Sequence, residues 1–199
     1  MTKIINIRGC NGAGKTTLVR KLIEAEPLPI DVVIASGYLT PGHYLPETRT
    51  LIVGPYKPGK ATGGMDNVNT TDEAKAAVAA GALGLFGLSG EELCHGPPRA
   101  VVFEGVLIST VYQTWVDFAR ENGGMKWAFL RTDVEECIRR VKERRAAKGR
   151  PEEGFKEKLV RDKHRSIESV RRKAIAAGLL VTDLTPGYEL ETLQELING

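Results

Sequence analysis

The feature that most restricts how this chain can fold is an eight-residue run near its amino terminus. Residues 9–16 read Gly-Cys-Asn-Gly-Ala-Gly-Lys-Thr, which fits the pattern G-x-x-x-x-G-K-[ST]. The run follows a β-rich segment at residues 4–7 and precedes residues 15–24, whose apolar side chains share one helical face. A strand, a glycine-rich loop and a helix in this order predict backbone N–H groups that surround a phosphate. An ordinary glycine-rich turn that matches the pattern by chance is the alternative.

The residues of this loop have distinct expected roles. We expect the Lys15 ammonium group to lie beside the β- and γ-phosphates of ATP and to take part in catalysis. We expect the Thr16 hydroxyl group to ligate Mg²⁺. The other candidates for contact with ATP are Asn11, Gly12, Ala13, Gly14 and Thr17.

Two acidic residues outside the loop are candidates for catalysis. Glu104 ends the apolar run Ala-Val-Val-Phe, and ligands bind at the carboxyl ends of parallel strands, so we expect it to support Mg²⁺ or to accept a proton. Asp66, in the run Gly-Gly-Met-Asp at residues 63–66, is our first candidate to orient or deprotonate an acceptor hydroxyl group. A solvent-exposed strand end and a turn aspartate are the respective alternatives, and which carboxylate is the base stays open.

Positive charge is concentrated in one segment. Residues 131–173 contain 16 lysine and arginine residues against 9 aspartate and glutamate residues, in a chain with a formal charge of +3. Arg139, Arg140, Arg144 and Arg145 lie on adjoining turns of a predicted helix, with Arg140 and Arg144 on one face. We expect Arg140 and Arg144 to stabilise charge during phosphoryl transfer, the alternative being a solvated basic face. The break at residues 149–154 predicts a hinged helical lid over about residues 140–158.

The pattern of segments predicts one domain over residues 1–199. Strands alternate with helices, which favours a three-layer α/β fold with a parallel sheet flanked by helices. Thr70 with Glu73 and Thr132 with Glu135 have the spacing of capping boxes ahead of helices. We expect loops on the acceptor side within about residues 36–69, where Tyr38, His43, Tyr44 and Tyr56 either stack on a base or anchor a loop.

The composition excludes several other classes of protein. Apolar runs are too short to cross a bilayer, and the amino terminus lacks the pattern of a secretion signal, so we expect a cytoplasmic protein. Cys10, Cys94 and Cys137 lack the spacing of a zinc site and are expected to be reduced thiols. The sequences that recognise guanine in GTPases are missing from this chain.

With the loop, the strand that ends in Val-Phe-Glu-Gly at residues 102–105, and the strand and basic helix of residues 128–150, the chain resembles the small P-loop kinases. The resemblance implies the three-layer P-loop fold with a five-stranded parallel sheet, ATP with Mg²⁺, and an acceptor opposite the loop. It also implies that Arg140 lies near the adenine and Arg144 or Arg145 near the phosphates. The acceptor-binding arginine motifs of adenylate and thymidylate kinases are not recognisable, which disfavours a free monophosphate as the acceptor.

Among these kinases, the loop together with the Gly-Gly-Met-Asp run looks most like the bacteriophage 5-hydroxymethyluracil DNA kinases. That resemblance implies transfer of the γ-phosphate of ATP to the hydroxymethyl group of the base in phage DNA, in the host cytoplasm. A deoxynucleoside monophosphate kinase and a polynucleotide 5′-hydroxyl kinase are alternatives within the class. A nucleotide-dependent switch or assembly ATPase, which has no acceptor, is the alternative from another class.

Overall fold

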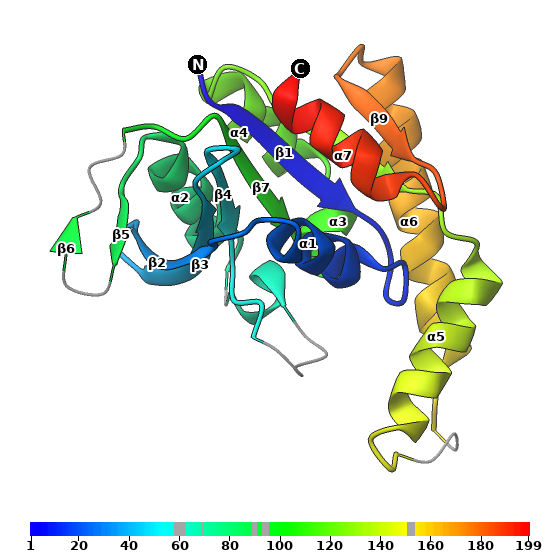
Figure 1. Ribbon diagram of the computed structural model, residues 1–199. Coiled ribbons are helices and arrows are strands. Elements are labelled where there is room, and N and C mark those ends of the chain that lie inside the picture. Colours follow the sequence, from blue (N-terminus) through cyan, green and yellow to red (C-terminus); the bar gives the residue numbers. More distant parts are fainter. Residues whose placement is uncertain (58–62, 69, 89–90, 93–95, 151–153) are drawn as a thin grey trace.

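The computed structural model shows a mixed α/β fold built on a single sheet, with helices packed against it (Figure 1). The structure describes residues 1–57, 63–68, 70–88, 91–92, 96–150 and 154–199. Nine strands of this described part form the sheet, in the order β6-β5-β2-β3-β4-β7-β1-β8-β9. No helix among the described residues is both long and apolar enough to cross a membrane.

Five neighbouring strands form the parallel part of the sheet. They are β4 (Thr50–Val53), β7 (Ala100–Glu104), β1 (Lys3–Arg8), β8 (Lys126–Leu130) and β9 (Val181–Leu184). Every residue of β4 and β7 is buried, which explains why their sequences are nearly continuous apolar runs. In the register, Ile7 of β1 pairs with Glu104 of β7, so the loop after β1 and the carboxylate that ends β7 lie at the same edge.

The sheet is mixed rather than parallel throughout, which corrects our expectation. The added strands are β2 (Ile30–Ala35), β3 (Leu39–Leu45), β5 (Phe86–Leu88) and β6 (Glu91–Glu92), and each pairs antiparallel with its neighbours in the sheet. Residues 36–48, which we expected as an exposed loop, contain all of β3. Gly42 allows β3 to approach β4, since a Cβ atom there would lie 2.8 Å from the Ile52 carbonyl oxygen.

Helices cover both faces of the parallel strands. Figure 1 shows α1 and α7 in front of the sheet, and α2, α3 and α4 behind it. Their bounds are α1 (Lys15–Glu24), α2 (Thr71–Ala82), α3 (Val106–Thr110), α4 (Gln113–Glu121) and α7 (Glu189–Asn198). The capping residue expected for α2 is confirmed, because the Thr70 hydroxyl oxygen accepts a hydrogen bond from the Glu73 N–H group at 3.1 Å.

Two further corrections concern the boundaries of elements. The sequence predicts one helix over residues 111–120, which corresponds to α4; the short helix α3 before it was not expected, and the extended backbone of Val111 separates the two. The sequence predicts the last strand at residues 179–182, whereas β9 begins at Val181. The sequence also predicts that Gly178 ends the preceding helix, and its φ of 67° confirms this. Because the Leu179 N–H group still bonds to the Ala174 carbonyl oxygen, the strand begins later than predicted.

The basic segment forms a helical hairpin that extends beyond the sheet, as Figure 1 shows for α5. The two helices are α5 (Val134–Ala146) and α6 (Glu157–Ala176). Lys142 pairs with Glu157 at 2.8 Å, and the Arg145 guanidinium carbon lies 5.6 Å from the centre of the Phe155 ring. The glycine-containing break expected between two basic helices is therefore confirmed, although residues 151–153 lie outside the described residues.

Candidate active site

The loop between β1 and α1 has a backbone that only glycine can adopt at two positions. Gly12 has φ of 84°, and a Cβ atom there would lie 2.3 Å from the Cys137 carbonyl oxygen. Gly14, with φ of 98°, is the N-cap residue of α1 and gives no side-chain hydrogen bond to the helix. The first backbone N–H groups of α1 therefore have no capping side chain, and such groups favour an anion.

Lys15 lies inside the loop rather than in solvent. Its side chain is buried, and its ammonium group donates hydrogen bonds to the carbonyl oxygens of Gly9 at 2.9 Å and Cys10 at 3.3 Å. These contacts hold a positive charge across the base of the loop. An anion in the loop would therefore meet a cation that is already in place.

Glu104 lies directly behind Thr16. The Thr16 hydroxyl group donates to Glu104 Oε1 at 2.9 Å, and the Tyr56 hydroxyl group is 3.5 Å from the same oxygen. The Glu104 side chain is fully buried, and its Oε2 atom has no hydrogen-bond partner among the described residues. Burial raises the pKa of Glu104 above its ordinary value, and Lys15 opposes this shift without cancelling it. The strand end is therefore not a solvent-exposed one.

Asp66 is held close to Glu104 by the tight packing of a short helix, η1 (Gly64–Asn67). A Cβ atom on Gly64 would lie 2.7 Å from both the carbonyl oxygen and Oε1 of Glu104. The Asp66 side chain is exposed, and its Oδ1 atom accepts a hydrogen bond from the Val106 N–H group at 2.6 Å. The loop and Asp66 therefore meet at the end of β7.

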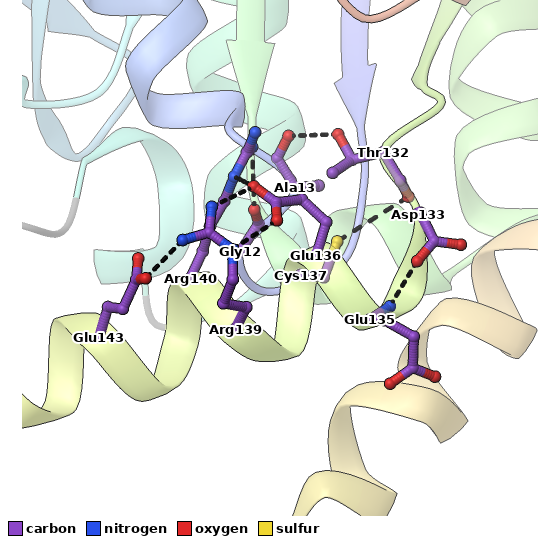
Figure 2. A network of polar contacts seen from close by, with 10 residues as sticks. All are labelled: Gly12, Ala13, Thr132, Asp133, Glu135, Glu136, Cys137, Arg139, Arg140 and Glu143. Carbon is purple, nitrogen blue, oxygen red and sulfur yellow. Dashed lines mark hydrogen bonds and ion pairs between the residues drawn. The ribbon is translucent and has the colours of Figure 1, made fainter.

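Arg139 and Arg140, neighbours on α5, have different surroundings (Figure 2). Arg140 lies against the loop, with Nη1 3.5 Å from the Gly12 carbonyl oxygen, and pairs with Glu136 at 2.6 Å. Arg139 pairs with Glu136 and Glu143 on the exposed side of the helix. The hydrogen bonds from Arg139 and Arg140 lower the pKa of Glu136 to about 2. The solvated basic face that we kept as an alternative thus describes Arg139.

A cavity of about 830 Å³ joins these groups, a volume suited to a nucleotide-sized ligand. Of the predicted site residues, those that line it are Asn11, Gly12, Ala13, Gly14, Lys15, Thr16, Thr17, Asp66, Arg140 and Arg144. Glu104 does not line it and reaches it through Thr16. The cavity also includes residues that sequence reasoning missed, among them Arg20 of α1 and Glu189 of α7. No local sequence pattern marks Glu189, because α7 reaches the cavity only in the folded structure, where it packs against α1.

One of the two predicted capping boxes is wrong. Asp133 is the N-cap residue of α5 and accepts a hydrogen bond from the Glu135 N–H group at 2.8 Å. Thr132 instead donates to the Ala13 carbonyl oxygen at 2.9 Å, as Figure 2 shows. Its hydroxyl group therefore links β8 to the loop, a contact between residues more than one hundred positions apart.

The tyrosine and histidine residues of the predicted acceptor-side segments do not form one cluster. Tyr44 packs on Phe86 with ring centres 5.2 Å apart, whereas Tyr38 is exposed. His43 Nδ1 lies 2.7 Å from Asp31, and its Nε2 accepts from the Tyr56 N–H group at 3.2 Å. Burial lowers the pKa of His43 despite Asp31. We expected these residues either to stack on a base or to anchor a loop. The contacts of His43 favour the second alternative, since they hold the segment that follows β4 in place.

The cysteines are consistent with reduced thiols. Cys10 and Cys137 are free and buried, and a hydrogen bond between their side chains lowers the pKa of Cys10 and raises that of Cys137. Cys94 and His95 lie outside the described residues.

The middle strand of the five parallel ones, β1, leads into a glycine-rich loop that faces a cavity with lysine, arginine and carboxylate groups, and this arrangement suits a nucleotide-dependent phosphotransferase, a kinase. The comparisons with known proteins agree. A family model described as 5-hmdU DNA kinase matches residues 1–182, and the chain belongs to this family.

Three curated relatives carry the same description. The 5-hmdU DNA kinase of Pseudomonas phage M6 is 42% identical over 204 residues, which cover 99% of this chain and 98% of the relative. The protein of that name from Pseudomonas phage PaMx11 is 27% identical over 200 residues, with coverage of 99% and 98%. That from Bacillus phage SP10 is 25% identical over 197 residues, which cover 90% of this chain and 26% of the relative.

Proposed function

We propose that this chain transfers the γ-phosphate of ATP to the hydroxymethyl group of 5-hydroxymethyluracil in DNA. The observation that carries the proposal is the meeting of the loop, Asp66 and Arg140 at one cavity, in a chain of the 5-hmdU DNA kinase family. Family membership favours a base hydroxymethyl group over a 5′-hydroxyl group or a free monophosphate as the acceptor. It also favours a kinase over a switch ATPase without an acceptor.

We propose that the donor side is a P-loop, which the glycine-rich loop between β1 and α1 and the buried Lys15 support. In the proposed complex, the backbone N–H groups of the loop contact the phosphates of ATP, and the oxygens of these phosphates replace the Gly9 and Cys10 carbonyl groups as partners of Lys15. The residues proposed to contact ATP through this loop are Asn11, Gly12, Ala13, Gly14, Lys15, Thr16 and Thr17.

The pair formed by Thr16 and Glu104 fits Mg²⁺. Both provide oxygen atoms, which Mg²⁺ prefers, and Glu104 Oε2 is a buried carboxylate oxygen without a partner among the described residues. Mg²⁺ held by these residues would neutralise negative charge on the phosphates of ATP. We assign the Thr16 hydroxyl group to direct ligation and Glu104 to orienting that hydroxyl group and the water around the ion.

Asp66 is the proposed base. Its Oδ1 atom is engaged by the Val106 N–H group, and the exposed carboxylate lines the cavity, whereas Glu104 is buried behind Thr16. The acceptor oxygen attacks the γ-phosphorus atom, its proton passes to Asp66, and the bond from the γ-phosphorus atom to the β-phosphate oxygen breaks. The products are ADP and the phosphorylated hydroxymethyl group.

Arg140 and Arg144 are the proposed lid residues that stabilise the transferring phosphoryl group. Both line the cavity, and Arg140 already lies beside Gly12, which favours contact with the phosphates over contact with the adenine. In the single domain that we propose, the lid of about residues 140–158 closes on the donor. The segments within about residues 36–69 then face the DNA.

The test is transfer of labelled γ-phosphate from ATP to a panel of acceptors. The panel contains DNA with 5-hydroxymethyluracil, unmodified DNA with free 5′-hydroxyl groups, and free deoxynucleoside monophosphates. We expect label only in the modified base, and no transfer by Lys15→Ala. Lys75→Ala, which removes a lysine paired with Asp72 on α2, is the matched control and should transfer normally. Label confined to 5′ ends or diphosphates, or slow hydrolysis without any labelled acceptor, would refute the proposal.

A further inference from the structure

A fully buried arginine, Arg8, lies at the end of β1 directly before the loop. Its guanidinium carbon is 3.9 Å from the centre of the Trp127 ring on the neighbouring strand β8. Among the described residues, no carboxylate pairs with it, and its Nε and Nη2 atoms have no hydrogen-bond partner. Burial lowers the pKa of Arg8, as expected for a cation removed from water. Stacking on tryptophan offsets only part of the cost of burying a charge.

The hydrogen bonds that Arg8 does make go to the carboxyl end of α3. Its Nη1 atom donates to the carbonyl oxygens of Ser109 at 3.2 Å and Val111 at 2.9 Å. Carbonyl groups at the end of a helix have no partner within the helix, and a fixed donor holds them in place. The side chain of Arg8 therefore ties α3 to the strand that leads into the loop.

Ser109 adds a second connection between the same elements. Its hydroxyl group donates to the Gly105 carbonyl oxygen at 2.6 Å and accepts from the Gly9 N–H group at 3.3 Å. Gly9 is the first residue of the loop. Arg8 and Ser109 thus hold one end of α3 against the start of the loop through buried contacts.

The other end of α3 holds Asp66. The Val106 N–H group, in the first turn of α3, donates to Asp66 Oδ1 at 2.6 Å. Because α3 has five residues, its length is about 7.5 Å at the rise of an α-helix. A short rigid element thus connects the loop, where the phosphate donor is proposed to bind, to the proposed base.

We propose that Arg8 is a positioning residue for phosphoryl transfer, which sets the place of Asp66 relative to the loop through α3. The proposal rests on the proposed function, since it takes Asp66 as the base. Arg8 lies outside the set of residues that line the cavity, so it acts through α3 and not by contact with the phosphates.

The experiment measures kcat and KM for ATP with 5-hydroxymethyluracil DNA as the acceptor. Arg8→Met keeps an unbranched side chain over Trp127 but removes both hydrogen bonds to α3. We expect kcat to fall about 10- to 100-fold, the size of effect that misplacement by about 1 Å produces, with little change in the KM for ATP. Arg8→Lys, which keeps a donor, should recover part of kcat.

A double-mutant cycle separates positioning from general destabilisation. In the Asp66→Asn background, Arg8→Met should change kcat less than about threefold, because the group that Arg8 positions has already been removed. Phe129→Leu is the control, since Phe129 is a buried cross-strand neighbour of Arg8 on β8. We expect this control to lower the melting temperature and to leave kcat nearly unchanged.

The outcomes distinguish the two proposals. The positioning role would be refuted if Arg8→Met lowered kcat equally in the wild-type and Asp66→Asn backgrounds. It would also be refuted if Phe129→Leu lowered kcat as much as Arg8→Met does. Either result would leave the proposed function intact. Failure of the wild-type protein to phosphorylate the modified base would refute both. If Arg8→Met does not fold, Ser109→Ala removes the second connection and is put through the same cycle, with the same outcomes expected.

Discussion

Replacing Glu104 with glutamine tests how the buried charge of the Glu104 carboxyl group affects stability. The Glu104 carboxyl group is fully buried, and burial raises its pKa although Lys15 lies nearby. Glutamine has nearly the same shape, and its amide oxygen can still accept the hydrogen bond from Thr16. The substitution therefore removes the charge while keeping the packing of the strand end.

The expected effect on stability depends on pH with a defined sign. Because the pKa is raised in the folded state, the folded protein binds this proton more tightly than the unfolded chain does. Wild-type stability is therefore lost as pH rises from the ordinary glutamate value of about 4.3 through the folded-state value, with a slope of at most about 1.4 kcal/mol per pH unit. The variant instead bears a constant cost of about 1–3 kcal/mol for its unpaired amide N–H group.

The assay is thermal unfolding between pH 4.5 and 8, followed by circular dichroism, without nucleotide or Mg²⁺. We expect the variant to melt below the wild type at low pH, with a difference that narrows or reverses as pH rises. For a chain of this size, 1 kcal/mol corresponds to about 2–4 °C. Glu24→Gln, an exposed site on α1, is the matched control and should show no such trend. A constant difference between Glu104→Gln and wild type at every pH would refute the reasoning.

Two further predictions concern the contacts between the loop and its neighbours. Thr132→Val leaves the Ala13 carbonyl oxygen without its donor and should lower the free energy of unfolding by about 1–3 kcal/mol, measured by urea denaturation. Thr132→Ser keeps a hydroxyl donor and should restore most of the lost free energy of unfolding. Equal losses of this free energy in both variants would contradict a stabilising hydrogen bond from Thr132 to Ala13. Arg140→Ala should lower kcat/KM for ATP by about 10- to 100-fold, as expected for lost charged hydrogen bonds. Arg139→Ala removes only exposed ion pairs and should change kcat/KM for ATP little. If both substitutions lowered kcat/KM equally, a special role for Arg140 would be ruled out.

Much of the donor side could be predicted from the sequence because its chemistry is local. Phosphate-binding loops need glycine at particular backbone angles, and residues 9–16 show that requirement directly, as the φ angles of Gly12 and Gly14 confirm. Helix signals of the same local kind, Thr70 before α2 and Gly178 after α6, are also confirmed. The resemblance to 5-hydroxymethyluracil DNA kinases, drawn from the same short runs, agrees with the family to which the chain belongs.

Where a contact joins distant parts of the chain, only the tertiary structure decided the outcome. Thr132 has the spacing of a helix cap, yet the packing of β8 beside the loop places its hydroxyl group on Ala13. Proline and glycine predict a loop in residues 36–48, yet pairing with two neighbouring strands makes β3 there. Likewise, the sequence places Arg8 only between the strand predicted at residues 4–7 and the glycine-rich loop, and gives no sign of its partners. A buried polar group takes whatever partner the packing brings within hydrogen-bonding distance, and that partner can lie one hundred residues away.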